Sequence, residues 1–126
     1  MIRSRVVDLQ VFQRAYALSL EIHRASLLFP QIEQYALADQ VRRASKSICV
    51  NVAEGYAKRA ASQVDFKRFL IIALGSSDEM QIWSRYCLDL GYIEQAVAER
   101  WLGEYEAISG MLQALIRKVA QGVAES

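Results

Sequence analysis

Apolar side chains that recur every three or four residues along four long segments constrain the fold more than any other feature of this sequence. The first segment carries such a stripe in Val11, Ala15, Leu18, Ile22, Ala25 and Phe29. This spacing gives a helix one apolar face, and it predicts a helix over about residues 9–28. Pro30 ends the helix, because proline disfavours helical geometry at the preceding residue and has no amide hydrogen.

The second segment predicts a helix from Ala36 or Leu37 to about Lys58. Its stripe consists of Leu37, Val41, Ala44, Ile48 and Val52. Between Ile48 and Ala57 the helix is apolar nearly all round, which indicates burial on more than one side.

The last two segments have recognisable ends. Residues 62–65 read as a capping box, in which the Ser62 hydroxyl accepts from an amide and Asp65 bonds back, so the third helix starts there. Leu90 and Gly91 are typical of a glycine C-cap. The fourth helix spans about residues 94–120, with an apolar face at Val97, Trp101, Ile108, Leu112, Leu115 and Val119.

Long helices with short connections pack antiparallel to their neighbours in sequence. We therefore predict an all-α fold, an antiparallel up-and-down four-helix bundle, as a single domain over residues 1–126 with tails at 1–8 and 121–126. The apolar fraction of 53% exceeds the usual globular share, which is a first sign of an interface.

Other residues argue against several classes of protein. Cys49 and Cys87 lie in apolar helical runs with no CxxC spacing and no secretory segment ahead of them, so we expect buried thiols in a cytoplasmic protein. The longest apolar stretch without charge, residues 69–77, is too short to span a membrane, so no membrane role is expected. His23 is the only histidine, so neither a metal site nor a cofactor is expected, and no paired acid or nucleophile suggests an enzyme.

Positive charge gathers in the first half of the chain. Residues 1–70 hold eleven Lys or Arg against six Asp or Glu, and residues 71–126 hold four against eight. We single out seven cations as candidate nucleic-acid contacts: Arg42, Arg43, Lys46, Lys58, Arg59, Lys67 and Arg68. Such clusters contact phosphates and make binding depend steeply on salt. The alternative is a solvated helix face paired with the acidic second half.

Two further groups are candidate structural surfaces. Asn51 and Glu54 are polar on the most apolar stretch, so we expect them to form a polar seam, with Glu54 paired to Lys58 or to a basic group on another helix or subunit. Gly75 lies in mid-helix, where a close helix approach would offset its cost. The predicted oligomer interface comprises Val50, Ala53, Ala57, Ile71, Gly75, Ile82 and Tyr86.

The runs LADQVRRASKSICVNVAEGYAKR and FKRFLIIALGSSDE, with the later LDLGYI, carry a family resemblance. They resemble the bacterial four-helix-bundle family of 23S rRNA intervening-sequence proteins. That family is similar to accessory proteins of diversity-generating retroelements, which form rings of five bundles and bind nucleic acid and a reverse transcriptase. The resemblance implies a homo-oligomer, specifically a pentamer, with RNA or DNA as a partner and a protein such as a reverse transcriptase as another.

The leading hypothesis is a non-enzymatic homo-oligomeric bundle that binds nucleic acid with little sequence preference through the seven cations. The alternative is a protein–protein interaction scaffold with no nucleic-acid role, in which the basic residues pair with acidic helices of neighbouring subunits.

Overall fold

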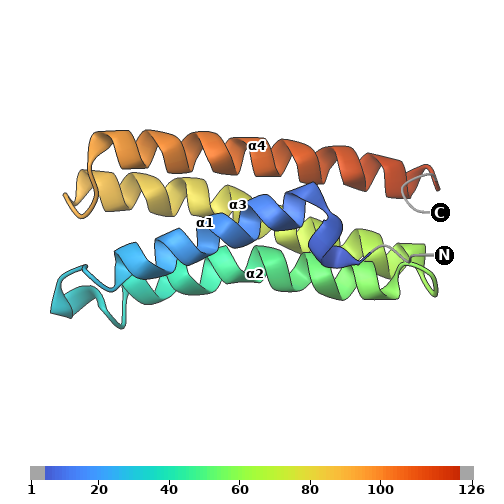
Figure 1. The fold of residues 1–126 in the computed structure, drawn as a ribbon, viewed down its shortest axis with the longest axis horizontal. Helices are drawn as coiled ribbons and strands as arrows, with labels where there is room; N and C mark the ends of the chain where they lie inside the picture. Colours follow the sequence, from blue (N-terminus) through green and yellow to red (C-terminus); the bar gives the residue numbers. More distant parts are fainter. Residues whose placement is uncertain (1–4, 123–126) are drawn as a thin grey trace.

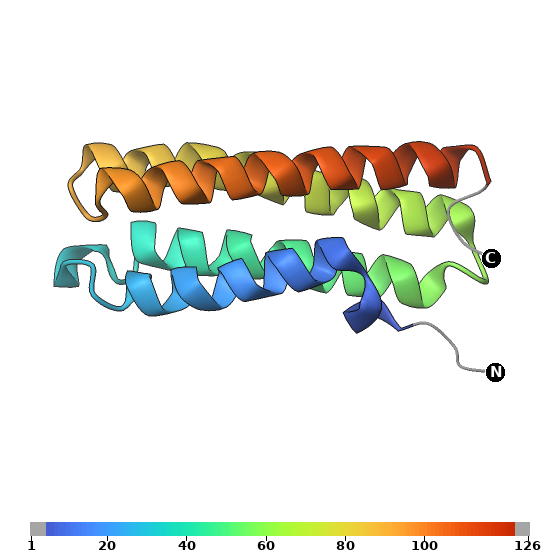
Figure 2. The ribbon, with the colours of Figure 1, turned by 45° about the horizontal axis from the view of Figure 1, so that its top comes forward.

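The computed structural model describes residues 5–122, and within this range the chain forms four α-helices joined by short connections. The elements in chain order are the 3-10 helix η1 (Val6–Asp8), α1 (Gln10–Ser26), the 3-10 helix η2 (Gln31–Glu33), α2 (Leu37–Lys58), α3 (Gln63–Asp89) and α4 (Gln95–Ala120). Each helix runs antiparallel to the next (Figures 1 and 2). The predicted all-α, up-and-down bundle is confirmed.

The helix bounds agree with the predicted ones to within two residues, but the predicted tails differ. Residues 6–8 form η1, in which the Asp8 carboxylate accepts from the Arg5 amide at 3.0 Å, so this part of the chain is folded. At the other end, Gln121 and Gly122 form a turn with a positive φ at the glycine. The rest of both predicted tails, residues 1–4 and 123–126, lies outside the described residues.

Two predicted helix ends can be compared with their hydrogen bonds. The Ser62 Oγ accepts from the Asp65 amide at 3.1 Å, but the reciprocal half of the capping box does not form. The Ser62 amide donates to the Lys58 carbonyl instead, so the Asp65 carboxylate pairs with Arg68 at 3.4 Å. At the far end of α3 the glycine cap is confirmed: Gly91 has φ 81°, and the Tyr92 amide donates to the Cys87 carbonyl.

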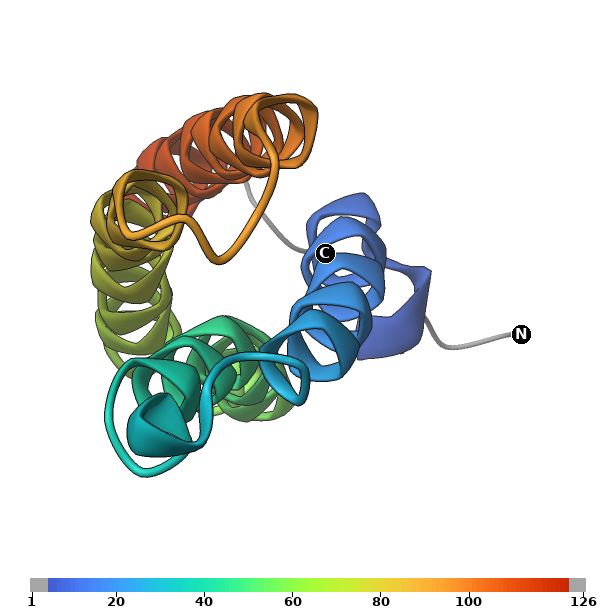
Figure 3. The ribbon, with the colours of Figure 1, turned by 90° about the vertical axis from the view of Figure 1, so that its left-hand side faces the viewer.

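The core fills the space enclosed by the four helices, which Figure 3 shows end-on. Its largest fully buried side chains are Trp101, Tyr105, Phe66, Ile22, Ile48 and Leu70. α1 lies between α2 and α4 and packs more extensively on α2 than on α4. The α1–α4 seam is therefore the more open side of α1. No helix in the described part of the chain is long and apolar enough to cross a membrane.

α2 and α3 approach each other closely at Gly55. A Cβ built on Gly55 would lie 2.9 Å from the Phe69 Cβ and 3.1 Å from the Phe66 carbonyl oxygen. A side chain at this position would therefore meet atoms that cannot move without shifting a helix. Gly75, for which a close helix approach was predicted, has no atom of another element within 4 Å of its would-be Cβ. Gly75 faces outward from α3, so no close approach to another helix forms there within one chain, and its predicted contact with another copy stays a prediction.

Candidate nucleic-acid interface

The seven predicted cations divide between the two ends of the bundle. Arg42, Arg43 and Lys46 lie in the first half of α2, whereas Lys58, Arg59, Lys67 and Arg68 surround the α2–α3 turn. At 1.5 Å of rise per residue, Arg43 and Arg59 are about 24 Å apart along the helix. The sequence clusters these residues, but the structure separates them into two sites.

Arg42 serves the connection between α1 and α2. Its guanidinium donates to the Ser26 Oγ at 2.8 Å, to the Gln34 carbonyl at 2.8 Å and to the Gln34 side-chain oxygen at 3.3 Å. Gln34 Nε2 in turn donates to the carbonyls of Ser26 and Phe29. Arg42 therefore holds this connection in place, and its guanidinium already has protein acceptors.

The other two cations at this end are exposed. Arg43 pairs loosely with Asp39, one turn earlier, at 3.8 Å. Lys46 Nζ lies 2.8 Å from His23 Nδ1, which must accept because an ammonium group only donates. Partial burial and the nearby charges of Lys46, Arg42 and Arg24 lower the pKa of His23. Arg24 thus belongs to the same basic group, although helical spacing within α2 could not reveal it.

At the α2–α3 end, aromatic rings orient the cations. The Arg59 guanidinium lies 3.6 Å from the centre of the Tyr56 ring and donates to the Tyr56 carbonyl at 2.7 Å. The Arg68 guanidinium lies 4.6 Å from the centre of the Phe69 ring, and Lys58 Nζ approaches the same ring at 5.9 Å. These contacts restrict the side chains while leaving part of each charged group accessible.

The last turn of α4 adds charge to this end of the molecule. A shallow depression is lined by Gln63, Val64, Lys67, Val119, Ala120, Gln121 and Gly122, which places Lys67 beside the end of α4. Arg117 and Lys118 are exposed in that last turn. We use the name basic end for Lys58, Arg59, Lys67, Arg68, Arg117 and Lys118. Among residues 5–122, the acids beside the basic end are Asp65, which pairs with Arg68, and Glu54, which pairs with Lys58.

The predicted polar seam runs between α2 and α3. Asn51 Nδ2 donates to the Ser47 carbonyl at 2.8 Å and to the Ser47 Oγ at 3.1 Å, and the Ser76 Oγ donates to the same hydroxyl at 3.0 Å. Glu54 is not part of this half-buried network. Its side chain is 48% exposed, and it pairs with Lys58 at 3.0 Å. A carboxylate in water needs no buried partner.

The predicted interface residues lie on two faces. Ile71, Ile82 and Tyr86 are about half exposed and, with Gly75, line the side of α3 that points away from the core. Val64 and Ile72, which sequence reasoning missed, extend this stripe. We call these six residues the α3 stripe. The α2 residues Val50, Ala53 and Ala57 lie on the outward side of their own helix, and Val50 and Ala57 are exposed.

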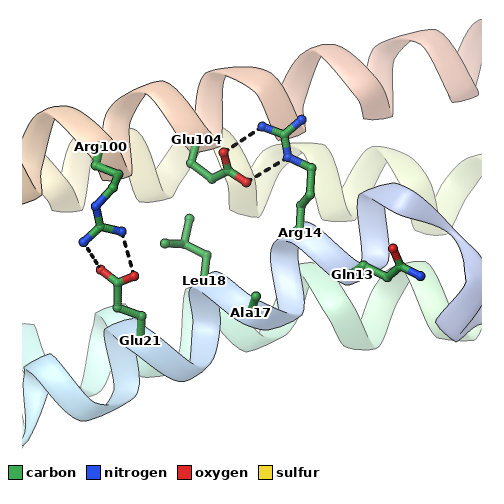
Figure 4. A pocket seen from close by; sticks show the side chains of 7 residues that line it. All are labelled: Gln13, Arg14, Ala17, Leu18, Glu21, Arg100 and Glu104. Atoms are coloured by element: carbon green, nitrogen blue, oxygen red, sulfur yellow. Dashed lines mark hydrogen bonds and ion pairs between the residues drawn. The ribbon is translucent and has the colours of Figure 1, made fainter.

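A groove along the α1–α4 seam was not predicted at all. It has a volume of about 370 Å³ and is lined by Gln13, Arg14, Ala17, Leu18, Glu21, Arg100 and Glu104 (Figure 4). Two ion pairs of opposite polarity cross it, Arg14–Glu104 at 2.7 Å and Arg100–Glu21 at 2.6 Å. Trp101 Nε1 also donates to Glu21 at 2.7 Å. These polar groups satisfy one another, so the groove serves first as a fastening between two helices.

Burial suppresses the reactivity of both cysteines. Burial raises the pKa of Cys49 to about 11 and that of Cys87 to about 12, so both thiols are protonated and unreactive near neutral pH. Burial also raises the pKa of the Tyr105 hydroxyl, which is fully buried. Residues 5–122 contain no cluster of three or more His, Cys, Asp or Glu side chains suited to hold a metal ion.

Comparison with known proteins supports the fold and identifies a family. A solved structure, of a protein of unknown function from the S23 ribosomal protein family of Bacteroides thetaiotaomicron, is 22% identical with a TM-score of 0.75. The match covers 85% of this chain and 95% of that one, and it shows a shared fold. No curated protein matches the sequence significantly. The sequence model of the 23S rRNA-intervening sequence protein family matches residues 7–114, so the chain belongs to this family.

Proposed function

We propose that this protein is a non-enzymatic, self-associating helical bundle that binds the phosphate backbone of RNA or DNA through its basic end. One observation carries the proposal: within residues 5–122, the α2–α3 turn and the last turn of α4 gather six cations beside the carboxylates of Glu54 and Asp65. Phosphate contacts require this kind of excess, and they provide affinity without reading sequence. The family's name, 23S rRNA-intervening sequence protein, adds an RNA context.

The restricted side-chain conformations of Arg59 and Arg68 support this proposal. A free Arg or Lys side chain loses rotamer entropy when it binds a phosphate. Arg59 over Tyr56 and Arg68 over Phe69 have already lost part of that freedom. The ion pair of Arg68 with Asp65 does not prevent binding, because such exposed pairs are weak and the guanidinium can exchange one anion for another.

Salt titration tests this proposal directly. Labelled RNA and DNA oligonucleotides are titrated with protein between 50 and 200 mM salt, and Kd is followed by fluorescence anisotropy. Five or six phosphate contacts predict a slope of log Kobs against log salt of about −4.5 to −5.5 on duplex DNA. Absence of binding at the lowest salt would reject the proposal.

A matched pair of charge reversals on α3 locates the surface. Lys67→Glu changes a cation of the basic end, and Arg85→Glu makes the same change about 27 Å further along the same helix. Lys67→Glu should weaken binding to every oligonucleotide and lower the salt slope by about 1 to 2, whereas Arg85→Glu should leave both nearly unchanged. Equal effects of the two variants would indicate general attraction rather than a defined surface.

For the assembly, we propose that the α3 stripe contacts another copy of the chain and that five copies form a ring. Support comes from the exposed apolar side chains that the α3 stripe places on one side of the helix, away from the core. Sedimentation velocity should give a mass near five times 14.3 kDa. Ile82→Lys should reduce it, whereas Leu28→Lys, away from α3, should not. A monomeric wild-type protein at micromolar concentration would contradict the assembly.

The second candidate function is a protein-binding scaffold without a nucleic-acid role. Three internal ion pairs favour it, because Arg43, Lys58 and Arg68 each have an acidic neighbour on their own helix. Charge reversal at Lys67 separates the two functions. If the cations serve assembly, Lys67→Glu should change the mass of the assembly and leave oligonucleotide binding unchanged. If they contact phosphates, it should weaken oligonucleotide binding at unchanged mass.

A further inference from the structure

The connection between α1 and α2 exposes three large apolar side chains almost completely. Leu28, Ile32 and Tyr35 are 87%, 85% and 93% exposed, the highest values for large apolar residues in the described part of the chain. Figures 1 and 2 show this connection at one extreme end of the bundle, opposite the α2–α3 turn. We call these three residues the apolar tip.

The apolar tip belongs to an ordered part of the structure. Phe29 is buried in the same connection, with its ring 5.2 Å from that of Tyr92. The Glu33 carboxylate accepts from the Tyr92 hydroxyl at 2.7 Å and from the Leu37 amide at 3.2 Å. Arg42 closes the connection from the other side, through Gln34. The backbone that carries the tip is therefore fixed, and a ligand would not have to order it.

Cations flank the tip on the helices that lead into it and away from it. Arg24 is exposed on the last turn of α1, and Arg43 and Lys46 are exposed on α2. Lys46 Nζ lies 2.8 Å from His23 Nδ1, and Arg24 follows His23 in α1, so both cations lie near this histidine. Of the nearby acids, Glu33 is engaged by Tyr92, and Asp39 is opposed by Arg43. This charge pattern suits a polyanion.

Proteins commonly bind unpaired nucleotides through exposed aromatic side chains together with cations. Cations contact the backbone, and each unpaired base offers a face that can stack on an aromatic side chain. The bases of a duplex are already stacked on one another and cannot cover Tyr35 without being pulled out. The combination therefore favours single strands over duplexes.

We propose that the α1–α2 end binds single-stranded nucleic acid, with a base stacked on Tyr35 and the backbone phosphates contacting Arg24, Arg43 and Lys46. Leu28 and Ile32 extend the platform beside the ring. The inference rests on the proposed function, since it assigns a strand type and a second contact region to the same activity. The basic end then provides salt-dependent affinity for any strand, and the tip distinguishes unpaired from paired nucleotides.

The test compares a labelled twenty-nucleotide oligo-dT with a ten-base-pair, two-stranded duplex of similar charge, by fluorescence anisotropy at fixed salt. Tyr35→Ala should weaken oligo-dT binding about tenfold or more and leave duplex binding unchanged. Tyr35→Phe keeps the ring and should restore binding. Tyr16→Ala removes a half-exposed tyrosine on α1 and serves as the matched control.

Each outcome has one meaning. If Tyr35→Ala binds oligo-dT as well as the wild type does, the tip is not a stacking platform, while salt-dependent binding by the basic end still stands. If neither oligonucleotide binds at low salt, the proposed function itself fails. If Tyr35→Ala lowers the mass of the assembly without affecting oligo-dT, the tip contacts protein and the inference is overturned. Tyr35 contacts almost nothing in the bundle, so its variants should fold normally, which circular dichroism can verify.

Discussion

The substitution of Gly55 by alanine offers a sharp test of the helix packing described above. Gly55 is buried where α2 meets α3, and an added Cβ would lie 2.9 Å from the Phe69 Cβ. The next atoms, Phe66 Cδ1 and the Phe66 carbonyl oxygen, are both at 3.1 Å. Two of these three atoms belong to the backbone or are attached directly to it. Relief of the clash therefore requires α2 and α3 to separate locally by a few tenths of an ångström.

The magnitude follows from two opposing effects. Overpacking of a well-filled core typically costs about 1–3 kcal/mol. Replacement of glycine by alanine inside a helix gains about 1 kcal/mol, through helix propensity. With rigid neighbours the steric cost is at the upper end, so Gly55→Ala should lower the free energy of unfolding by about 1–2 kcal/mol. In a domain of this size that corresponds to a fall in Tm of about 3–8 °C.

Gly103 provides the matched control. It is exposed on α4, and an added Cβ there would meet no atom of another element within 4 Å. Gly103→Ala should therefore raise the free energy of unfolding by up to about 1 kcal/mol. Urea denaturation of both variants and the wild type, at one protein concentration, measures the expected difference of about 1–3 kcal/mol between the two variants. A Gly55→Ala variant as stable as the wild type would refute the packing of α2 against α3.

Three further predictions concern the polar contacts. Arg42→Ala should lower the free energy of unfolding by about 2 kcal/mol, because the α1–α2 connection loses a charged hydrogen-bond donor. Hydrogen exchange of the backbone amides in residues 27–36 should become faster. Arg100 holds the pKa of Glu21 below its ordinary value, so the pair stabilises the fold above pH 4.5 and is lost as pH falls through the lowered pKa. Because this pair is exposed, Glu21→Gln should lower the free energy of unfolding by about 1 kcal/mol at pH 7 and by much less at pH 3. Urea denaturation measures both values, and an equal loss at the two pH values would contradict the ion pair. The pKa of His23 is lowered in the folded state, so its protonation opposes folding. As the pH falls from 7.5 to 5.5, the Tm of the wild type should therefore fall more than that of His23→Gln. Parallel plots of Tm against pH for the two proteins would disprove the effect.

Much of the fold was predictable because the buried positions of a helix recur every three or four residues, so apolar residues at that spacing indicate a helix. The stripe from Val11 to Phe29 and the glycine at position 91 determine where the first helix lies and where the third one ends. Both signals act between residues a few positions apart, where the geometry of a helix is known in advance. The same reasoning located the seven cations but not their neighbours.

Residues far apart in sequence explain what was missed. Arg14 pairs with Glu104 and Glu21 with Arg100, across 79 to 90 positions, and no local pattern distinguishes these charges from solvated ones. Gly55 and Gly75 look alike in a helical sequence, yet only Gly55 faces another helix. The facing partner depends on how each helix rotates about its axis, which core packing decides.

The sequence by itself determined four helices, their order, their apolar faces and the excess of positive charge before residue 71. Each of these depends on composition or on spacing along one helix, so the chain contains the information locally. The tertiary structure decided how the cations divide between two ends, that Arg42 anchors a connection, and that the apolar tip is exposed. Those outcomes depend on which side chains meet across the bundle, and such meetings arise only when all four helices pack together.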